Sequence, residues 1–337
     1  MTKVAILGGS GYTAVELIKI LLRHPAVQIE AVISRQEGTP LVAEQHPSLA
    51  GRINLRCEPF NVDSLVTRGV ECVFGCLPHG VSMKSLPALL HRGLRVIDLS
   101  ADYRLRDPNT YAQWYGESHE DLANLAQAVY GLPELYGDEL PAAQLVANPG
   151  CYPQTAILGL APLVAGKHIE LKSIIVDSKS GVSGAGRTPK LTTHFPECNE
   201  SVSAYAVGSH RHTPEIEQAL ADVAGEPVEV IFTPHLMPMD RGIFSTVYAT
   251  PVRSFSPEQL LELYREYYAK SPFIRLSKDL PATKHTSGTN FVDMTVRVVR
   301  GRVVVLVAED NLIRGASGVA VQNFNRMYGH DEKTGLW

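Results

Sequence analysis

Short apolar runs alternate with helix-like spacing over the first third of the chain. The run at residues 3–7 leads into Gly8-Gly9-Ser10-Gly11, after which apolar positions between 14 and 21 mark one helix face. Similar patterns predict strands over residues 27–33, 72–77 and 94–99, and a helix over 81–92. Alternation of this kind predicts right-handed βαβ units and a doubly wound parallel sheet. Residues 103–143 follow no such period and are expected to form a long irregular excursion.

The second half of the chain is dominated by β-branched runs with few helical stretches between them. These runs predict strands over residues 171–179, 228–233, 243–250, 291–299 and 303–308. Arg300-Gly301 joins the last two as a tight hairpin turn, and a helix is predicted over residues 316–328. The expected fold class is therefore α/β. It combines a Rossmann-type doubly wound parallel sheet with an α+β domain built on a mainly antiparallel sheet.

Length and composition limit the domain count and the partners. A chain of 337 residues exceeds what one hydrophobic core serves well, so we expect a first domain over 1–147, completed by 314–337, and a second over 148–313. With 45% hydrophobic residues, 20% charged residues and a formal charge of −4, the chain has no basic footprint for nucleic acid or anionic membrane. No apolar run is long enough to span a membrane. The five cysteines are an odd set without a framework pattern, which favours a reducing cytoplasm.

The segment around Cys151 is the strongest chemical signal. A short apolar run over 144–147 meets an Asn148-Pro149-Gly150 turn, then Cys151, and helical spacing follows from Thr155. Pro153 fits a first helical turn, where its missing N–H costs nothing. A cysteine beside the amides and positive dipole end of a helix is favoured as thiolate, so we interpret Cys151 as a nucleophile rather than core filler.

The glycine-rich segment after the first strand predicts a nucleotide site. Gly8 and Gly11 permit a tight turn and close approach of a pyrophosphate, and Ala14 is small enough for helix–strand packing. At the end of the second predicted strand, Ser34 and Arg35 stand where NAD enzymes place an acid on the ribose. A hydroxyl and a guanidinium suit a 2′-phosphate, so NADP is favoured over NAD, although Glu37 lies close by.

A cysteine enzyme needs a proton shuttle, and His210 and His212 are the candidates, because they stand just before a predicted helix that begins near Pro214. The alternative is that Thr213 caps this helix and both histidines are solvated. A metal site is a further alternative, using either the two histidines or Cys72, Cys76 and His79. Neither set has a zinc-ligand spacing, so we expect no metal.

Two further segments leave predicted strands with polar side chains. Residues 180–187, with Ser183 and Arg187, form a flexible loop able to offer amides and hydroxyls to a carboxylate or amide. Arg104 follows a first-domain strand at the edge where ligands of such sheets bind, so it is either an anion clamp or a surface arginine paired with a nearby aspartate.

Together these features resemble the N-acetyl-gamma-glutamyl-phosphate reductase family, which is related to aspartate-semialdehyde dehydrogenase. The resemblance spans nearly the whole chain through six ordered motifs, at residues 8–14, 100–104, 148–153, 180–187, 210–215 and 235–242. The cysteine motif and the His-Arg-His segment separate this family from its aspartyl relatives.

The resemblance implies NADPH-dependent reduction of N-acetyl-gamma-glutamyl phosphate, a small-molecule acyl phosphate, to N-acetylglutamate 5-semialdehyde and phosphate in arginine biosynthesis. It implies a cysteinyl thioester on Cys151, with His210 as acid/base and His212 as the close second. We assign NADP contacts to Gly8, Gly9, Ser10, Gly11, Tyr12, Thr13, Ser34, Arg35, Gly184 and Asn311. We assign substrate contacts to Arg104, Asn148, Ser183, Arg187 and His212. A cytoplasmic homo-oligomer, dimer or tetramer, is expected.

Three alternatives remain at this point. The chain could be an aspartate-semialdehyde dehydrogenase, a reductase of acyl phosphates carried on a small acidic protein, or a dinucleotide-sensing binding module without catalysis.

Overall fold

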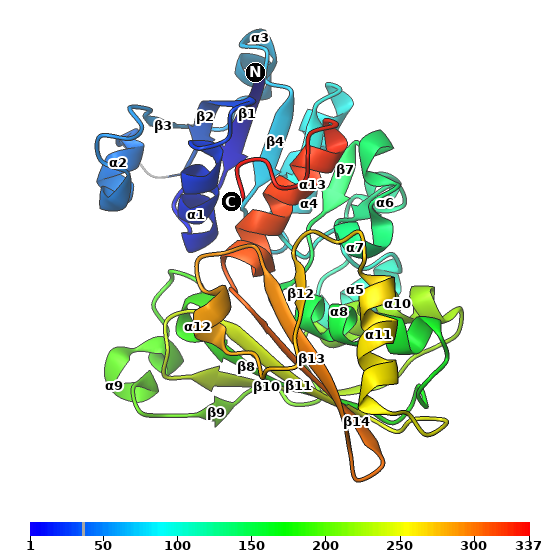
Figure 1. The fold of residues 1–337 in the computed structure, drawn as a ribbon. Coiled ribbons are helices and arrows are strands. Elements are labelled where there is room, and N and C mark those ends of the chain that lie inside the picture. The colour runs from blue at the N-terminus through cyan, green and yellow to red at the C-terminus, as the bar shows by residue number, and fades with distance from the viewer. Residues whose placement is uncertain (36–37) are drawn as a thin grey trace. The chain divides into compact units, whose positions relative to one another are not determined.

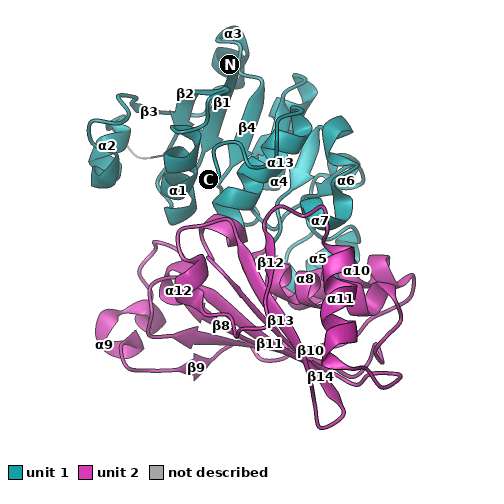
Figure 2. Cartoon of the chain, viewed as in Figure 1, with its two compact units in different colours: residues 1–149, 316–337 teal, residues 150–315 magenta. Residues whose placement is uncertain are grey.

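The computed structural model describes residues 1–35 and 38–337. Within these residues the chain forms two β-sheets, with helices packed around them (Figure 1). Glu37, one of the residues weighed for coenzyme choice, lies outside the described residues. The chain divides into unit 1, residues 1–149 and 316–337, and unit 2, residues 150–315 (Figure 2).

Unit 1 contains a parallel sheet of seven described strands in the order β3-β2-β1-β4-β5-β7-β6. The strands are β1 (Thr2–Leu7), β2 (Val27–Ile33), β3 (Cys57–Glu58), β4 (Cys72–Gly75), β5 (Arg95–Asp98), β6 (Val129–Tyr130) and β7 (Leu145–Ala147). The helices are α1 (Tyr12–Leu21), α2 (Val42–Gln45), α3 (Val62–Thr67), α4 (Ser82–His91), α5 (Pro108–Tyr115), α6 (Leu122–Leu125), α7 (Pro133–Tyr136) and α13 (Gly318–Met327). The strand order reverses between β1 and β4, as in dinucleotide-binding folds, which confirms the predicted Rossmann-type sheet.

The segment 103–143 is more ordered than its sequence suggested. It contains α5, α6 and α7, of which α5 is the longest. Asp107 caps α5 by accepting bonds from the amides of Asn109 and Thr110, and Gly116 ends the helix in a left-handed conformation. These caps are local signals, and they stabilise a helix whose apolar spacing is weak.

Unit 2 is built on a mixed sheet of seven described strands in the order β12-β13-β14-β11-β8-β10-β9. The strands are β8 (Ile174–Gly181), β9 (Ser203–Ala204), β10 (Val230–Met237), β11 (Ile243–Ala249), β12 (Ile274–Leu276), β13 (Val292–Val299) and β14 (Arg302–Glu309). The helices are α8 (Cys151–Ala165), α9 (Phe195–Cys198), α10 (Thr213–Ala224), α11 (Pro257–Tyr267) and α12 (Thr283–Thr286). Four of the six neighbouring pairs are antiparallel, which confirms the mainly antiparallel expectation, while β8–β10 and β12–β13 are parallel.

Helix α8 forms the centre of unit 2. It buries every residue from Tyr152 to Val164 and packs against α10, β11 and β14. Pro162 cannot donate to the carbonyl of Leu158, but the hydroxyl of Tyr268 donates to that carbonyl at 2.6 Å. The proline is therefore tolerated inside the helix because a side chain from another element satisfies the orphaned acceptor.

Candidate active site

Cys151 is the first residue of α8. Strand β7 runs into the Asn-Pro-Gly turn, and Gly150, with extended backbone angles, is the N-cap of the helix. Pro153 occupies the first turn and has no N–H, and the amide of Gln154 already donates to the Gly150 carbonyl at 3.3 Å. The first turn of α8 therefore lies with its amides and the positive end of the helix dipole beside Cys151. Cys151 is partly exposed, as a nucleophilic residue must be.

Glu215 connects the cysteine turn to the His-Arg-His segment. Its side chain is 1% exposed and accepts the Gly150 amide at 2.7 Å, one residue before the nucleophile. Glu215 stands in the first turn of α10, the helix that packs most closely on α8. The motifs around residues 150 and 210–215 therefore form one structural assembly, which sequence reasoning did not identify because the two segments are far apart in the chain.

A second close approach to Cys151 comes from Gly315. A Cβ atom built on Gly315 would lie 2.8 Å from Cys151 Cβ, 3.2 Å from Glu309 Oε1 and 3.3 Å from the Asp310 carbonyl oxygen. Carbon atoms do not approach so closely, so only glycine fits at this position. The segment after β14 is consequently packed directly on the nucleophile.

His210 and His212 lie against the residue that follows the nucleophile. Their ring centroids are 5.7 Å and 6.0 Å from that of Tyr152, and 4.8 Å from one another. Burial, with a smaller contribution from the Arg211 charge, lowers the pKa of His210 to about 4. Helix α10 begins at Thr213, and no side chain caps it. The alternative interpretation, in which Thr213 caps the helix, is therefore wrong.

Tyr205 completes this cluster, and sequence reasoning missed it. Its hydroxyl donates to the Tyr152 hydroxyl at 3.1 Å, which donates in turn to the His235 carbonyl at 3.1 Å. Burial raises the pKa of Tyr205 to about 12, and a charge on Cys151 contributes to that shift. Tyr205 follows the two-residue strand β9 in a stretch without hydrophobic periodicity, so no sequence pattern marked it.

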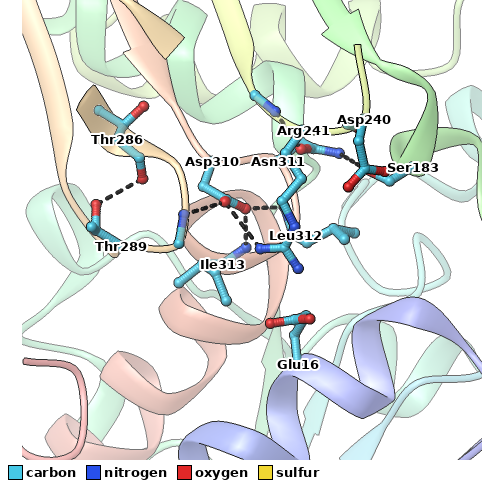
Figure 3. A network of polar contacts seen from close by, with 12 residues as sticks. Glu16, Ser183, Asp240, Arg241, Thr286, Thr289, Asp310, Asn311, Leu312 and Ile313 are labelled. Atoms are coloured by element: carbon cyan, nitrogen blue, oxygen red, sulfur yellow. Dashed lines mark hydrogen bonds and ion pairs between the residues drawn. The ribbon is translucent and has the colours of Figure 1, made fainter. Parts of the chain in front are cut away.

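The polar loop after β8 is held by an internal network (Figure 3). The Ser183 hydroxyl donates to the Asp240 carbonyl at 2.6 Å and accepts from the side-chain amide of Asn311 at 3.0 Å. The Asn311 oxygen accepts from the Gly242 amide at 2.7 Å. A Cβ on Gly184 would lie 3.0 Å from the Ser180 hydroxyl, so glycine keeps the loop close to its strand. Arg187, further along the loop, is exposed.

Asp310 is the hub of the neighbouring turn, as Figure 3 shows. Its carboxylate is fully buried and accepts from the amides of Gly288, Leu312 and Ile313 at 2.6, 2.8 and 2.8 Å. It also pairs with Arg241 at 3.1 Å. Four donors on one carboxylate fix the path of the chain just before Gly315, and this structural role had no sequence signal beyond the position of Asp310 after a strand.

The nucleotide loop lies in unit 1, between β1 and α1. Gly8 has a φ of 78°, and a Cβ there would lie 2.3 Å from the Cys76 carbonyl oxygen. A Cβ on Gly9 would lie 2.3 Å from a Val32 methyl group, whereas at Gly11, the N-cap of α1, the nearest atom is 4.0 Å away. The first two glycines are required by packing. The open side of Gly11 fits the approach of a pyrophosphate to the helix start. Ser10, Tyr12 and Thr13 stand at the same helix start.

The predicted coenzyme and substrate residues of unit 1 differ in their surroundings. Ser34 is half-buried and Arg35 exposed at the end of β2. Arg104 is 6% exposed, and its guanidinium donates to the carbonyls of Asn148 and Leu99 at 2.8 and 3.0 Å. The Asn148 side chain donates to the Ala316 carbonyl at 3.1 Å. These contacts of Arg104 and Asn148 support the turn before Gly150, and their substrate-binding role stays a prediction.

Cys72 and Cys76 have surroundings unlike that of Cys151. Burial raises the pKa of Cys72 and of Cys76 to about 12, and none of the five cysteines forms a disulfide. Within residues 1–35 and 38–337, no group of three or more His, Cys, Asp or Glu side chains is arranged to hold a metal ion. The same residues include no helix long and apolar enough to cross a membrane.

Comparison with known families agrees with this division of the chain. Residues 3–143 match the semialdehyde dehydrogenase NAD binding domain, and residues 151–311 match the semialdehyde dehydrogenase dimerisation domain. N-acetyl-gamma-glutamyl-phosphate reductase of Rhodopirellula baltica is 50% identical over 340 residues, covering 99% of this chain and 98% of the relative. The enzyme of the same name from Moorella thermoacetica is 49% identical, covering 100% and 98%.

Solved structures of aspartate semialdehyde dehydrogenases share the fold. The Vibrio cholerae enzyme II, complexed with ASA, has a TM-score of 0.73 at 16% identity, covering 98% of each chain. The Candida albicans enzyme with NADP has a TM-score of 0.71 at 15% identity, covering 97% of this chain and 98% of its own. At such identities the likeness concerns the fold alone.

Proposed function

Because the chain belongs to the N-acetyl-gamma-glutamyl-phosphate reductases of the semialdehyde dehydrogenase family, we propose that its chemistry proceeds through a thioester on Cys151. The reaction is the NADPH-dependent reduction of N-acetyl-gamma-glutamyl phosphate to N-acetylglutamate 5-semialdehyde and phosphate, in arginine biosynthesis. The observation that carries the proposal is a partly exposed cysteine at the start of a buried helix, held by Glu215 through the Gly150 amide.

The thiolate attacks the acyl-phosphate carbonyl. The S–C bond forms, the C–O bond to phosphate breaks, and phosphate leaves with that electron pair. The dipole of α8 favours the thiolate, and the covalent intermediate splits one difficult displacement into two easier steps. NADPH, when bound, supplies the hydride that reduces the thioester. The thiohemiacetal then collapses to the aldehyde and releases the thiolate.

The oxyanion of each tetrahedral state needs hydrogen-bond donors. We assign this role to the backbone amides of the first turn of α8, because a helix start directs its amides along the axis toward a ligand. Loss of one such donor costs about 10²- to 10³-fold in turnover in other enzymes.

The coenzyme residues divide between the units. In unit 1, the helix start after Gly11 would hold the pyrophosphate, and Ser34 and Arg35 the 2′-phosphate. In unit 2, Gly184 and Asn311 remain the candidates toward the nicotinamide, and Ser183, Arg187 and His212 toward the substrate.

The decisive experiment is turnover with NADP and phosphate, measured in the oxidative direction with either N-acetylglutamate semialdehyde or aspartate semialdehyde. We expect the acetylated substrate to be oxidised and the amino substrate to be rejected. Cys151→Ser should retain NADP binding and lose turnover, while Cys198→Ser, at another partly exposed cysteine, serves as the matched control. Substantial turnover by Cys151→Ser would overturn the thioester route.

A homo-oligomer accords with the dimerisation domain that the chain contains. The finer proposal is a dimer through the sheet of unit 2. Ile175 on β8 pairs with Tyr248 on β11 and with Ile231 on β10, so the three side chains form a row across the sheet. All three are exposed, by 40% for Ile175, 41% for Tyr248 and 62% for Ile231. Such a row of exposed apolar side chains is typical of an interface core. Ile231→Lys should shift the molar mass measured by light scattering from dimer toward monomer, and an unchanged mass would exclude this face. The cytoplasmic location stays a prediction.

A further inference from the structure

His46 is a buried histidine that contacts the nucleotide loop from a neighbouring segment. Its side chain is 6% exposed, and its Nε2 lies 2.7 Å from the carbonyl oxygen of Gly9, 37 positions earlier in the chain. Because a carbonyl oxygen can only accept, Nε2 carries a proton and donates it to this bond. The segment after β2 is thereby joined to the loop between β1 and α1.

The backbone around His46 is held on both sides. Its amide donates to the Val42 carbonyl at 2.9 Å, where α2 ends, and its carbonyl accepts the Leu49 amide at 2.9 Å, in the one-turn helix Pro47–Leu49. A residue before proline avoids the helical region, and His46 accordingly has a φ of −131° and a ψ of 85°. The imidazole therefore projects toward Gly9 from a backbone whose path is fixed.

The first two residues of the nucleotide loop are tied to the sheet. The amides of Gly8 and Gly9 both donate to the Ile33 carbonyl at 3.0 Å. Gly9 has no Cβ, because one would lie 2.3 Å from a Val32 methyl group. Glycine offers little steric resistance to rotation of the peptide plane that follows it. The hydrogen bond from His46 to the Gly9 carbonyl therefore restrains a plane that the backbone alone restrains weakly.

The direction of this carbonyl also determines the direction of the next amide. The Gly9–Ser10 peptide is trans, so its C=O and N–H point to opposite sides. Ser10 directly precedes Gly11, the N-cap of α1. Rotation of the plane would exchange an amide for a carbonyl, which repels an anion. We propose that His46 is a positioning residue for the coenzyme, holding the Gly9–Ser10 plane so that the loop presents an amide to the pyrophosphate.

This inference rests on the coenzyme part of the proposed function and is independent of the thioester route. His46 acts through Gly9 and does not touch the reacting atoms. The pyrophosphate is unchanged by hydride transfer, so the ground state and the transition state gain equally from the loop. Loss of the hydrogen bond should therefore raise the KM for NADPH and leave kcat unchanged.

Three variants separate the hydrogen bond from the packing of the ring. His46→Phe keeps a ring in the buried space and removes the donor, whereas in His46→Gln the side-chain amide nitrogen falls near the place of Nε2 and restores it. His24→Phe is the matched control, because His24 is 4% exposed and its Nε2 lies 2.8 Å from Asn325 Oδ1. That pair belongs to the same unit but joins the end of α1 to α13.

Binding is measured by calorimetric titration without substrate. NADP and 2′-phospho-ADP-ribose contain the pyrophosphate, while adenosine 2′-monophosphate contains only the 2′-phosphate. In His46→Phe the first two ligands should bind about 10- to 100-fold more weakly, the range for one hydrogen bond to a charged group, and adenosine 2′-monophosphate should change by less than about threefold. His46→Gln should stay within about fivefold of the parent for every ligand. His24→Phe should bind all of them as the parent does.

A Kd for NADP within about threefold of the parent in His46→Phe would overturn the proposal. An equal loss for adenosine 2′-monophosphate, or an equal loss in His24→Phe, would do the same, because either shows a general perturbation of unit 1. A collapse of kcat at saturating NADPH in His46→Phe would also contradict it. Because the titrations need no turnover and work equally in Cys151→Ser, failure of this inference is distinguishable from failure of the proposed reaction.

Discussion

The contact between Gly315 and Cys151 allows a sharp test of how closely the nucleophile is held. Gly315 has no left-handed backbone, so Gly315→Ala adds a methyl group without backbone strain. That methyl carbon would stand 2.8 Å from Cys151 Cβ. Carbon atoms pack best at ~3.5–4.0 Å, so one of the two segments must move by roughly 0.7–1.2 Å.

The magnitude follows from that displacement. Overpacking of this kind costs about 1–3 kcal/mol of stability. Misplacing a catalytic group by about 1 Å costs about 10²-fold in rate, which corresponds to about 2.7 kcal/mol of transition-state stabilisation. The neighbouring Glu309 oxygen and Asp310 carbonyl, at 3.2 and 3.3 Å from the added carbon, leave no easier direction of relief.

The assay compares kcat/KM, the rate of Cys151 alkylation by iodoacetamide, and urea unfolding. Gly159→Ala is the matched control, because it adds a methyl group to α8, the helix that carries Cys151, at 3.0 Å from a Val307 methyl group and not beside Cys151. We expect the control to keep its activity, and Gly315→Ala to lose about 10² in kcat/KM. A Gly315→Ala enzyme within about threefold of the parent would refute the reasoning that this contact positions the nucleophile.

Three further predictions follow from individual side chains. Arg35→Asp should weaken NADP binding more than NAD binding, measured by titration, whereas an unchanged ratio would place 2′-phosphate recognition elsewhere. Glu215→Ala leaves the Gly150 amide without its acceptor and should cost about 1–3 kcal/mol in urea unfolding, and Glu215→Gln, which keeps an oxygen, should cost less; equal costs would contradict this. Burial raises the pKa of Asp98 in the folded protein to about 6, above the value in the unfolded chain. The folded state therefore binds this proton more tightly, so the protonated carboxyl contributes its full stabilisation below about pH 4, and that contribution is lost as the pH rises through 6. The unfolding free energy of the parent relative to Asp98→Asn should fall by about 3 kcal/mol between pH 4 and 7, and a flat difference would contradict the shift.

The strand–turn–helix segments were predictable because their signals are local. Gly8 to Gly11 and the Asn-Pro-Gly turn before Cys151 both separate an apolar run from a helical period, and the helices begin at Tyr12 and Cys151. The hairpin at Arg300-Gly301 is likewise as expected, with both residues at positive φ. In each case a few adjacent residues determine the backbone path.

Features that depend on distant pairing could not be derived in this way. The parallel pair β8–β10 arises because α10 crosses between the strands, and no residue within either strand indicates it. Arg104 was predicted either to bind an anion or to lie on the surface. Its burial and its hydrogen bond to the Asn148 carbonyl depend on the tertiary position of the turn at residue 148, which is distant in sequence. Tyr205 meets Tyr152 only through the tertiary fold.

The burial of α8 from Tyr152 to Val164 has a consequence for the loss of activity on heating. Because these residues are covered on every side, their amide hydrogens should exchange with solvent only when unit 2 opens as a whole. The nucleophile at the first residue of α8 then keeps its surroundings for as long as the unit remains folded. Heat inactivation should therefore proceed at the rate of unfolding, and the half-life of activity becomes a measure of kinetic stability.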